Sequence, residues 1–163
     1  MTEFNASIEW QRGEKEAFSD NQFSRGHTWA FDGGVQVSAS SSPHVVPIPY
    51  SIAESVDPEE AFIAALSSCH MLTFLAIAAK KKFVIDTYRD IATGVLEQDR
   101  AGKSSVTRVT LRPNITFSGQ KQPTTQQLDK MHHLAHQNCF IANSVKTRIT
   151  IEARASVSKR SSP

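Results

Sequence analysis

Hydrophobic and polar positions alternate near the start of the chain, whereas its middle contains one long apolar run. Residues 4–10, 27–32 and 34–40 alternate in the manner of short strands. Residues 32–34, Asp-Gly-Gly, supply the turn between the last two of these strands. The pattern therefore predicts an opening meander of three strands.

A proline-rich segment, residues 41–55, separates the meander from the apolar run. Its prolines are Pro43, Pro47 and Pro49. They exclude a helix and predict a stiff surface loop. A helix begins directly afterwards, because Asp57 is a good N-cap, Pro58 suits the first helical position, and an acidic first turn complements the helix dipole.

The apolar run, residues 61–79, shows no single polar face. We therefore expect this helix to be buried nearly all round. Its length raises the alternative of a membrane span, which needs about 20 apolar residues. Polar residues at 67–70 and at Thr73 interrupt the run, so we expect a core helix and no membrane.

The second half of the chain alternates between strand-like and helical patterns. Residues 83–99 and 104–119 predict a second hairpin, with Gly102 in its turn. A second long helix is predicted over 123–139, where Thr124 and Gln127 have the spacing of a capping box. Residues 146–155 predict a closing strand. The order βββ, α, ββ, α, β indicates an α+β fold.

Composition narrows the class of protein. The 163 residues, 39% of them hydrophobic, suit one domain, which we place at 1–156, with 157–163 as a disordered tail. Since 18 Lys and Arg are nearly balanced by 16 Asp and Glu, we expect no nucleic acid or membrane partner. The first residues lack the apolar region of a secretory signal, which predicts a cytoplasmic protein with reduced thiols.

The chain has two cysteines, and Cys69 lies inside the apolar run. A cysteine in such a helix is usually an inert packing group. Here polar neighbours at 67, 68 and 70 favour a cleft or buried partners. A reactive thiolate also needs a cation nearby. Taken alone, Glu59 suits a surface group in a first turn, and Arg25 suits a solvated side chain.

A metal site is an alternative for the second helix. His132, His136 and Cys139 fall at i, i+4 and i+7, and two imidazoles and a thiolate would form half of a zinc site. Histidines at this spacing also occur as ordinary surface groups. Neither a second cysteine nor an HExxH motif supports the metal.

Two segments resemble the OsmC/Ohr family, the osmotically induced and organic hydroperoxide resistance proteins. They are DPEEAFIAALSSCHM, residues 57–71, and LAHQNCFIANSVKTRITIEA, residues 134–153. The likeness extends through most of the chain. It implies an OsmC-like α+β domain with antiparallel sheets, a long buried central helix, a second long helix and an intertwined homodimer.

The resemblance also implies a function, the thiol-dependent reduction of organic hydroperoxides to alcohols. By this likeness Cys69 is the peroxidatic cysteine and Cys139 the resolving one. Glu59 engages an active-site arginine, for which Arg25 is the first candidate and Arg12 the second. Cys69 would form a sulfenic acid and then a disulfide with Cys139, which a lipoyl-type or other dithiol would reduce. No metal or organic cofactor is implied.

Two other functions stay open beside the peroxidase. One is a metal-binding protein that uses His132, His136 and Cys139. The other is a relative that binds a small ligand without turnover.

Helix geometry adds a prediction about Glu59 and Cys69. Ten residues of α-helix rise about 15 Å and turn about 80° short of three full turns, which is too far for the two groups to act together in one chain. A two-fold dimer that crosses two such helices would bring the start of each toward the middle of the other. We therefore expect Glu59 of one subunit to complete the Cys69 site of its partner.

Overall fold

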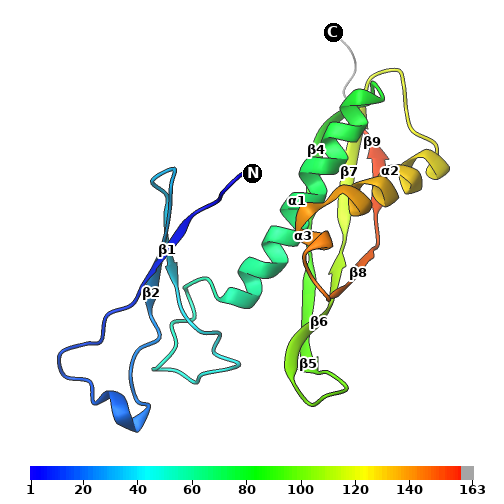
Figure 1. Ribbon diagram of the computed structural model, residues 1–163. Coiled ribbons are helices and arrows are strands. Elements are labelled where there is room, and N and C mark those ends of the chain that lie inside the picture. The colour runs from blue at the N-terminus through cyan, green and yellow to red at the C-terminus, as the bar shows by residue number, and fades with distance from the viewer. Residues whose placement is uncertain (159–163) are drawn as a thin grey trace. The chain divides into compact units, whose positions relative to one another are not determined.

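The computed structural model describes residues 1–158, and its chain divides into two compact units, Met1–Ala61 and Phe62–Pro163 (Figure 1). Residues 159–163, most of the predicted tail, lie outside the described residues. Val157 and Ser158, which the sequence assigns to the same tail, belong to the folded structure. Val157 pairs with Phe117, and Ser158 N donates to Phe117 O at 2.7 Å.

The N-terminal unit contains the predicted meander. Strands β1 (Ala6–Glu9), β2 (His27–Phe31) and β3 (Gln36–Ala39) form an antiparallel sheet in the order β1-β2-β3. A 3-10 turn, η1 (Phe18–Asp20), lies between β1 and β2. Gly34 takes a φ of 83° in the turn before β3, a conformation that glycine adopts without strain.

The proline-rich loop forms turns, as predicted, and hydrogen bonds attach it to the meander. Tyr50 O accepts a bond from Arg25 N at 2.8 Å, and Val56 O accepts one from Ser40 N at 3.1 Å. Buried Ser40 also accepts a bond from Ile52 N at 3.0 Å through its hydroxyl. These bonds give the loop a defined path although it has no helix or strand of its own.

Helix α1 (Pro58–Lys80) begins where the sequence predicts. Asp57 Oδ1 accepts a bond from Glu60 N at 2.7 Å, and Glu60 Oε2 accepts one from Asp57 N at 3.3 Å. This reciprocal pair satisfies two donors at the start of the helix. The helix ends before Lys82, which has a φ of 64°.

Burial of α1 is less complete than predicted. Its buried residues are Leu66, His70, Phe74 and Ala78. They recur every four residues and form one stripe, whereas Leu72 is 62% exposed. The prediction of all-round burial is wrong for a single chain. By length and composition alone α1 could span a membrane, with a mean hydropathy of 1.9, but a core helix passes the same test.

The C-terminal unit contains six strands in two three-stranded sheets, β4-β7-β9 and β5-β6-β8. Their bounds are β4 (Val84–Asp90), β5 (Thr93–Gln98), β6 (Ser104–Leu111), β7 (Pro113–Ser118), β8 (Arg148–Ile151) and β9 (Arg154–Val157). Each of the three predicted strand runs is thus interrupted and contributes one strand to each sheet. The expected second hairpin is β5 and β6, which pair antiparallel.

The interruption of the three runs centres on Arg112. Pro113 follows it and has no N–H for a ladder bond. Arg112 N donates to Asp90 Oδ1 at 2.6 Å, and its side chain donates to Glu152 Oε2 at 2.9 Å and to Thr93 Oγ1 at 2.8 Å. One arginine therefore connects all three runs at the level where each changes sheet.

The expectation of purely antiparallel sheets is wrong. β8 pairs parallel with β6, and β9 pairs parallel with β7. The reason is the connection, because α2 (Thr125–Asn138) and the short α3 (Phe140–Asn143) carry the chain back before β8 begins. Thr124 and Gln127 form the predicted capping box at the start of α2.

Helices α1 and α2 pack with the sheets around two apolar clusters (Figure 1). The first joins α1, β7 and α2 through Phe74, Ala78, Phe83, Ile115, Phe117, Met131 and Ala135. The second joins α1 and β6 through Leu66, Val109 and Leu111. Together they hold the middle of α1, which carries Cys69, against α2 and the sheets.

Candidate active site

The two cysteines occupy different environments in the C-terminal unit. Cys69 lies in the middle of α1 and is partly exposed, whereas Cys139 is 1% exposed, and both thiols are free. Cys139 lies between α2 and α3 as the C-cap of the first and the N-cap of the second, and its Sγ accepts a bond from Ala142 N at 3.4 Å. The turn between the two helices therefore fixes the second thiol.

The fold brings these two thiols together across 70 positions of sequence. Cys69 lies close enough to Cys139 to act on the pKa of its thiol. Burial, together with the neighbouring Cys69, raises the pKa of Cys139 to about 11. Cys139 is therefore a protonated thiol at neutral pH, directly beside a more exposed thiol.

A second contact between α1 and α2 lies next to the thiols. His70 Nε2 and His132 Nδ1 are 3.0 Å apart, and the two rings lie within 4° of parallel. His70 is 1% exposed and His132 5%, and Phe74 stacks on the His132 ring at 4.3 Å. The sequence analysis did not predict this pair. The one feature that could have indicated it is His70 itself, a histidine inside the apolar run, which needs a buried partner.

Polar residues of the C-terminal unit surround the imidazole pair. Asp90 accepts a bond from Ser67 Oγ at 2.5 Å, and its charge acts on both His70 and Tyr88. Burial, followed by Asp90, raises the pKa of Tyr88. The expectation that the polar residues around Cys69 need buried partners is thus met for Ser67 and His70, while Ser68 is exposed.

The imidazole pair predicts a loss of stability in acid. Burial lowers the pKa of each ring from 6.5 to about 4. For His70, the nearby His136 lowers the pKa further and Asp90 raises it. For His132, the nearby His70 lowers the pKa further. The unfolded chain then binds more protons than the folded chain between these values. Stability is fully present above pH 6.5 and is lost as the pH falls toward 4.

We expect the free energy of unfolding in urea to fall by roughly 2 kcal/mol per imidazole between pH 7 and pH 5. The measurement is the slope of the free energy of unfolding against pH, compared between wild type and His70→Leu/His132→Leu. The comparison is needed because carboxylates titrate in both proteins and contribute equally to the two slopes. His133→Asn, which changes an exposed neighbour, should keep the wild-type slope. Equal slopes in wild type and the double variant would contradict the prediction.

The geometry does not favour the metal alternative. Among residues 1–158 no group of three or more His, Cys, Asp or Glu side chains is placed to hold a metal ion. His132 directs Nδ1 to His70, and the neighbour that acts on the Cys139 thiol is Cys69. The helical spacing of His132, His136 and Cys139 therefore does not bring the three side chains to one point, since α2 ends before Cys139.

The candidate arginines lie in the N-terminal unit. Arg25 bonds Asn21 O at 3.0 Å, Asn21 Oδ1 at 2.6 Å and Phe23 O, and its guanidinium lies 3.8 Å from the centre of the Phe23 ring. Arg12 donates to Gly13 O at 3.3 Å and to Glu16 O. Both guanidinium groups thus bond groups of their own loops.

Glu59 lies in the first turn of α1 and is half-buried. In the part of the chain that the structure describes, ion pairs join Arg108 to Glu97 and Arg112 to Glu152, and none joins Arg25 to Glu59. The engagement of an arginine by Glu59 therefore stays a prediction.

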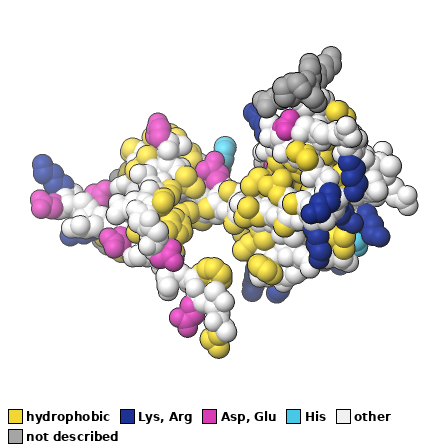
Figure 2. All heavy atoms as spheres, turned by 90° about the horizontal axis from the view of Figure 1, so that it is seen from above, with side chains coloured by type: hydrophobic (Ala, Val, Ile, Leu, Met, Phe, Trp, Pro, Cys, Tyr) yellow, Lys and Arg dark blue, Asp and Glu magenta, His cyan; other side chains and the backbone are white. Residues whose placement is uncertain are grey.

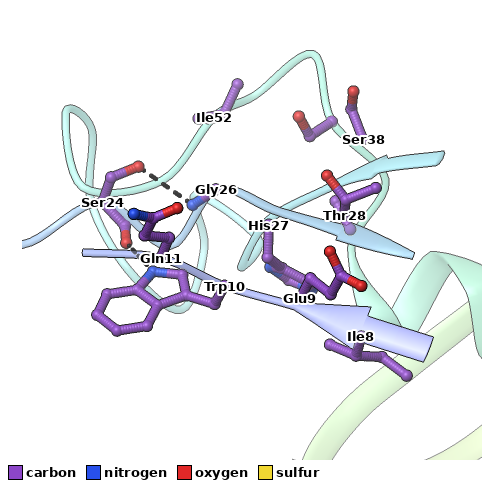
Figure 3. Close-up of a pocket in the computed structure, with 12 residues that line it drawn as sticks. Ile8, Glu9, Trp10, Gln11, Ser24, Gly26, His27, Thr28, Ser38 and Ile52 are labelled. Carbon is purple, nitrogen blue, oxygen red and sulfur yellow. Dashed lines mark hydrogen bonds between the residues drawn. The ribbon is translucent and has the colours of Figure 1, made fainter. Parts of the chain in front are cut away.

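A wide hollow of about 1090 Å³ opens on the N-terminal unit (Figure 3). Its lining residues are Ile8, Glu9, Trp10, Gln11, Ser24, Gly26, His27, Thr28, Ser38, Ala39, Ile52 and Ser55. Trp10 Nε1 donates to Ser24 O at 2.8 Å, and His27 donates from Nδ1 to Arg25 O and accepts from Trp29 at Nε2. These bonds fix the rings around the hollow, whose lining mixes polar and apolar groups.

Comparison with known proteins places this arrangement in a family. The model of OsmC-like proteins matches residues 53–154. None of the curated proteins matches the chain. An OsmC-like protein of unknown function from Vibrio cholerae is 59% identical, with a TM-score of 0.93 over 94% of this chain and 100% of its own.

Two organic hydroperoxide resistance proteins share the fold at lower identity. The protein from Elizabethkingia anophelis is 17% identical, with a TM-score of 0.68 over 97% of this chain and 98% of its own. OhrB of Bacillus subtilis is 17% identical, with a TM-score of 0.59 over 94% of this chain and 98% of its own.

Proposed function

This chain belongs to the OsmC-like family, and from that premise we propose that it is a thiol-dependent peroxidase that reduces organic hydroperoxides to alcohols. The observation that carries the proposal is that the fold brings Cys69 close enough to Cys139 to act on its thiol. Two neighbouring free thiols, one of them partly exposed, suit a cysteine pair that cycles between dithiol and disulfide. The hydroperoxide resistance relatives support the class of substrate.

The chemistry proceeds in two balanced steps. The Cys69 thiolate attacks one oxygen of ROOH, the O–O bond breaks, and the released alkoxide takes a proton to give ROH, leaving Cys69 as a sulfenic acid. The Cys139 thiol then attacks the Cys69 sulfur, which forms the disulfide and releases water. A lipoyl-type or other dithiol reduces the disulfide and becomes oxidised itself.

The different exposures of the thiols suit these roles. A partly exposed Cys69 can meet a substrate, whereas buried Cys139 is sheltered from the hydroperoxide. Because the pKa of Cys139 is raised, this thiol stays protonated and does not compete for the peroxide. Its position at the end of α2, beside Cys69, allows it to react with the Cys69 sulfenic acid once this has formed.

Activation of Cys69 needs a positive group, and we assign this role to Arg25, held by Glu59.

Since α1 leaves Leu72 62% exposed, the proposed assembly is a homodimer in which a second copy covers this apolar helix. Figure 2 shows hydrophobic side chains gathered on the surface, and Phe140, next to Cys139, is 81% exposed. Leu72 and Phe140, exposed apolar side chains that are close in sequence to Cys69 and Cys139, favour a substrate with an alkyl group. The proposed location is the cytoplasm.

Mass spectrometry after peroxide treatment tests the proposal. One equivalent of cumene hydroperoxide, added without reductant, should convert the free thiols to a Cys69–Cys139 disulfide, with a loss of two hydrogen atoms per chain. Hydrogen peroxide at the same concentration is the comparison for the preference for alkyl substrates. If both thiols stay reduced with every alkyl hydroperoxide tried, the proposal fails and a ligand-binding role without turnover takes its place.

A further inference from the structure

We propose that the buried pair of His70 and His132 is a positioning device that sets the approach of Cys69 to Cys139. The pair joins α1 to α2 at the position that follows Cys69, and its hydrogen bond and ring contacts are with each other and with Phe74, so we assign it a geometric role. The inference rests on the proposed function, because it concerns the step in which the disulfide forms.

The placement of the pair along the two helices is the first argument. His70 follows Cys69 directly on α1, and His132 on α2 precedes Cys139, the C-cap of that helix, by seven residues. Successive side chains of an α-helix point about 100° apart. The contact of His70 with His132 and the approach of Cys69 to Cys139 therefore restrain α1 from different directions. Together they fix the rotation of α1 against α2, which neither contact could do alone.

The directionality of the bond is the second argument. An N–H···N bond of 3.0 Å between rings within 4° of parallel restricts both distance and angle, whereas the apolar contacts around it have no preferred direction. Phe74 stacks on His132 and limits its tilt. A disulfide requires Cβ atoms about 3.5 to 4.5 Å apart, so a small shift of the helices would separate the thiols.

The cost of the pair is the third argument. His70 Nδ1 and His132 Nε2 are buried and have no hydrogen-bond partner within residues 1–158. A neutral pair with one shared bond leaves one donor and one acceptor at these outer nitrogens. Two apolar residues would avoid this penalty and pack as well. The site thus gives up stability for a directional contact, which a packing role alone would not require.

The test separates position from stability. In His70→Leu/His132→Leu no imidazole is left unpaired, so the protein should fold with at least wild-type stability at pH 7. We expect its disulfide to form about tenfold more slowly after one equivalent of cumene hydroperoxide, while Cys69 sulfenic acid forms at the wild-type rate. The dithiol–disulfide potential, measured in glutathione buffers, should rise by about 30 mV, which corresponds to a tenfold smaller equilibrium constant for disulfide formation.

Matched single variants test the geometry of the bond. His132→Asn places an amide where Nδ1 lies and should stay within about threefold of wild type in the rate of disulfide formation, whereas His132→Gln, of similar chemistry but one carbon longer, should be slowed. His133→Asn, at an exposed neighbour, should change nothing. Equal rates and potentials for the Asn and Gln variants would overturn the proposal, as would wild-type values in the double variant.

The two proposals can fail separately. The glutathione measurement needs no hydroperoxide, because oxidised glutathione is the oxidant. It takes two electrons and two protons from the protein dithiol and becomes two molecules of reduced glutathione as the protein disulfide forms. A wild-type protein that ignores hydroperoxides yet shows the 30 mV difference from the double variant would refute the peroxidase alone. A peroxidase whose potential and rate are unaffected by the double substitution would refute the positioning role alone.

Discussion

Cys69→Ser should abolish hydroperoxide reduction, with turnover lowered by about 10³-fold or more. A serine hydroxyl is a far weaker nucleophile than a thiolate at neutral pH, and no other thiol takes its place because Cys139 is buried and has a raised pKa. The measurement is consumption of cumene hydroperoxide with a dithiol such as dihydrolipoamide as reductant.

Cys139→Ser is the matched variant, and its outcome should differ in kind. It should consume one equivalent of hydroperoxide at the wild-type rate and then stop with Cys69 as a sulfenic acid, or as a sulfinic acid when peroxide is in excess. A thiol-specific sulfenic acid probe and mass spectrometry would identify the product. Turnover in Cys69→Ser comparable to wild type, or sulfenic acid on Cys139 in the wild type, would reverse the assigned roles.

Mixed dimers of Cys69→Ser and Glu59→Ala chains should regain activity, up to about half that of wild type per dimer, although each parent is nearly inactive. Both residues lie on the continuous helix α1, ten positions apart, and a separation of about 15 Å along the axis prevents direct cooperation within one chain. In a mixed dimer with composite sites, one site carries both damaged residues and the other is intact. Tandem affinity tags would isolate the mixed species for the assay.

The reverse combination is a control for this experiment. A dimer of wild type with the doubly substituted chain Cys69→Ser/Glu59→Ala has one substitution in each composite site and should be inactive. If the two residues act within one chain instead, this control keeps half of the activity and the first mixture has none. That pattern would exclude the shared site.

The starts of the helices were determined by the sequence alone. Asp57 is the N-cap that the sequence predicts, although its reciprocal bond with Glu60 was not predicted, and Thr124 and Gln127 form the capping box that their spacing predicts. Such bonds join groups three residues apart, so the local sequence contains both partners. The same holds for the motif around Cys69, because its spacing from Glu59 lies within one helix, and together with residues 134–153 it indicates the family.

The contacts that make the site were decided by the tertiary structure. His70 and His132 are 62 positions apart, and no local pattern records that they meet. Cys69 and Cys139 are 70 apart, and only the family resemblance, not the periodicity, indicated that they are neighbours. The break at Arg112, which joins three separate runs, and the parallel pairing of β8 and β9 are equally non-local. Periodicity shows which face of an element is apolar, but the partner of that face depends on how distant elements pack.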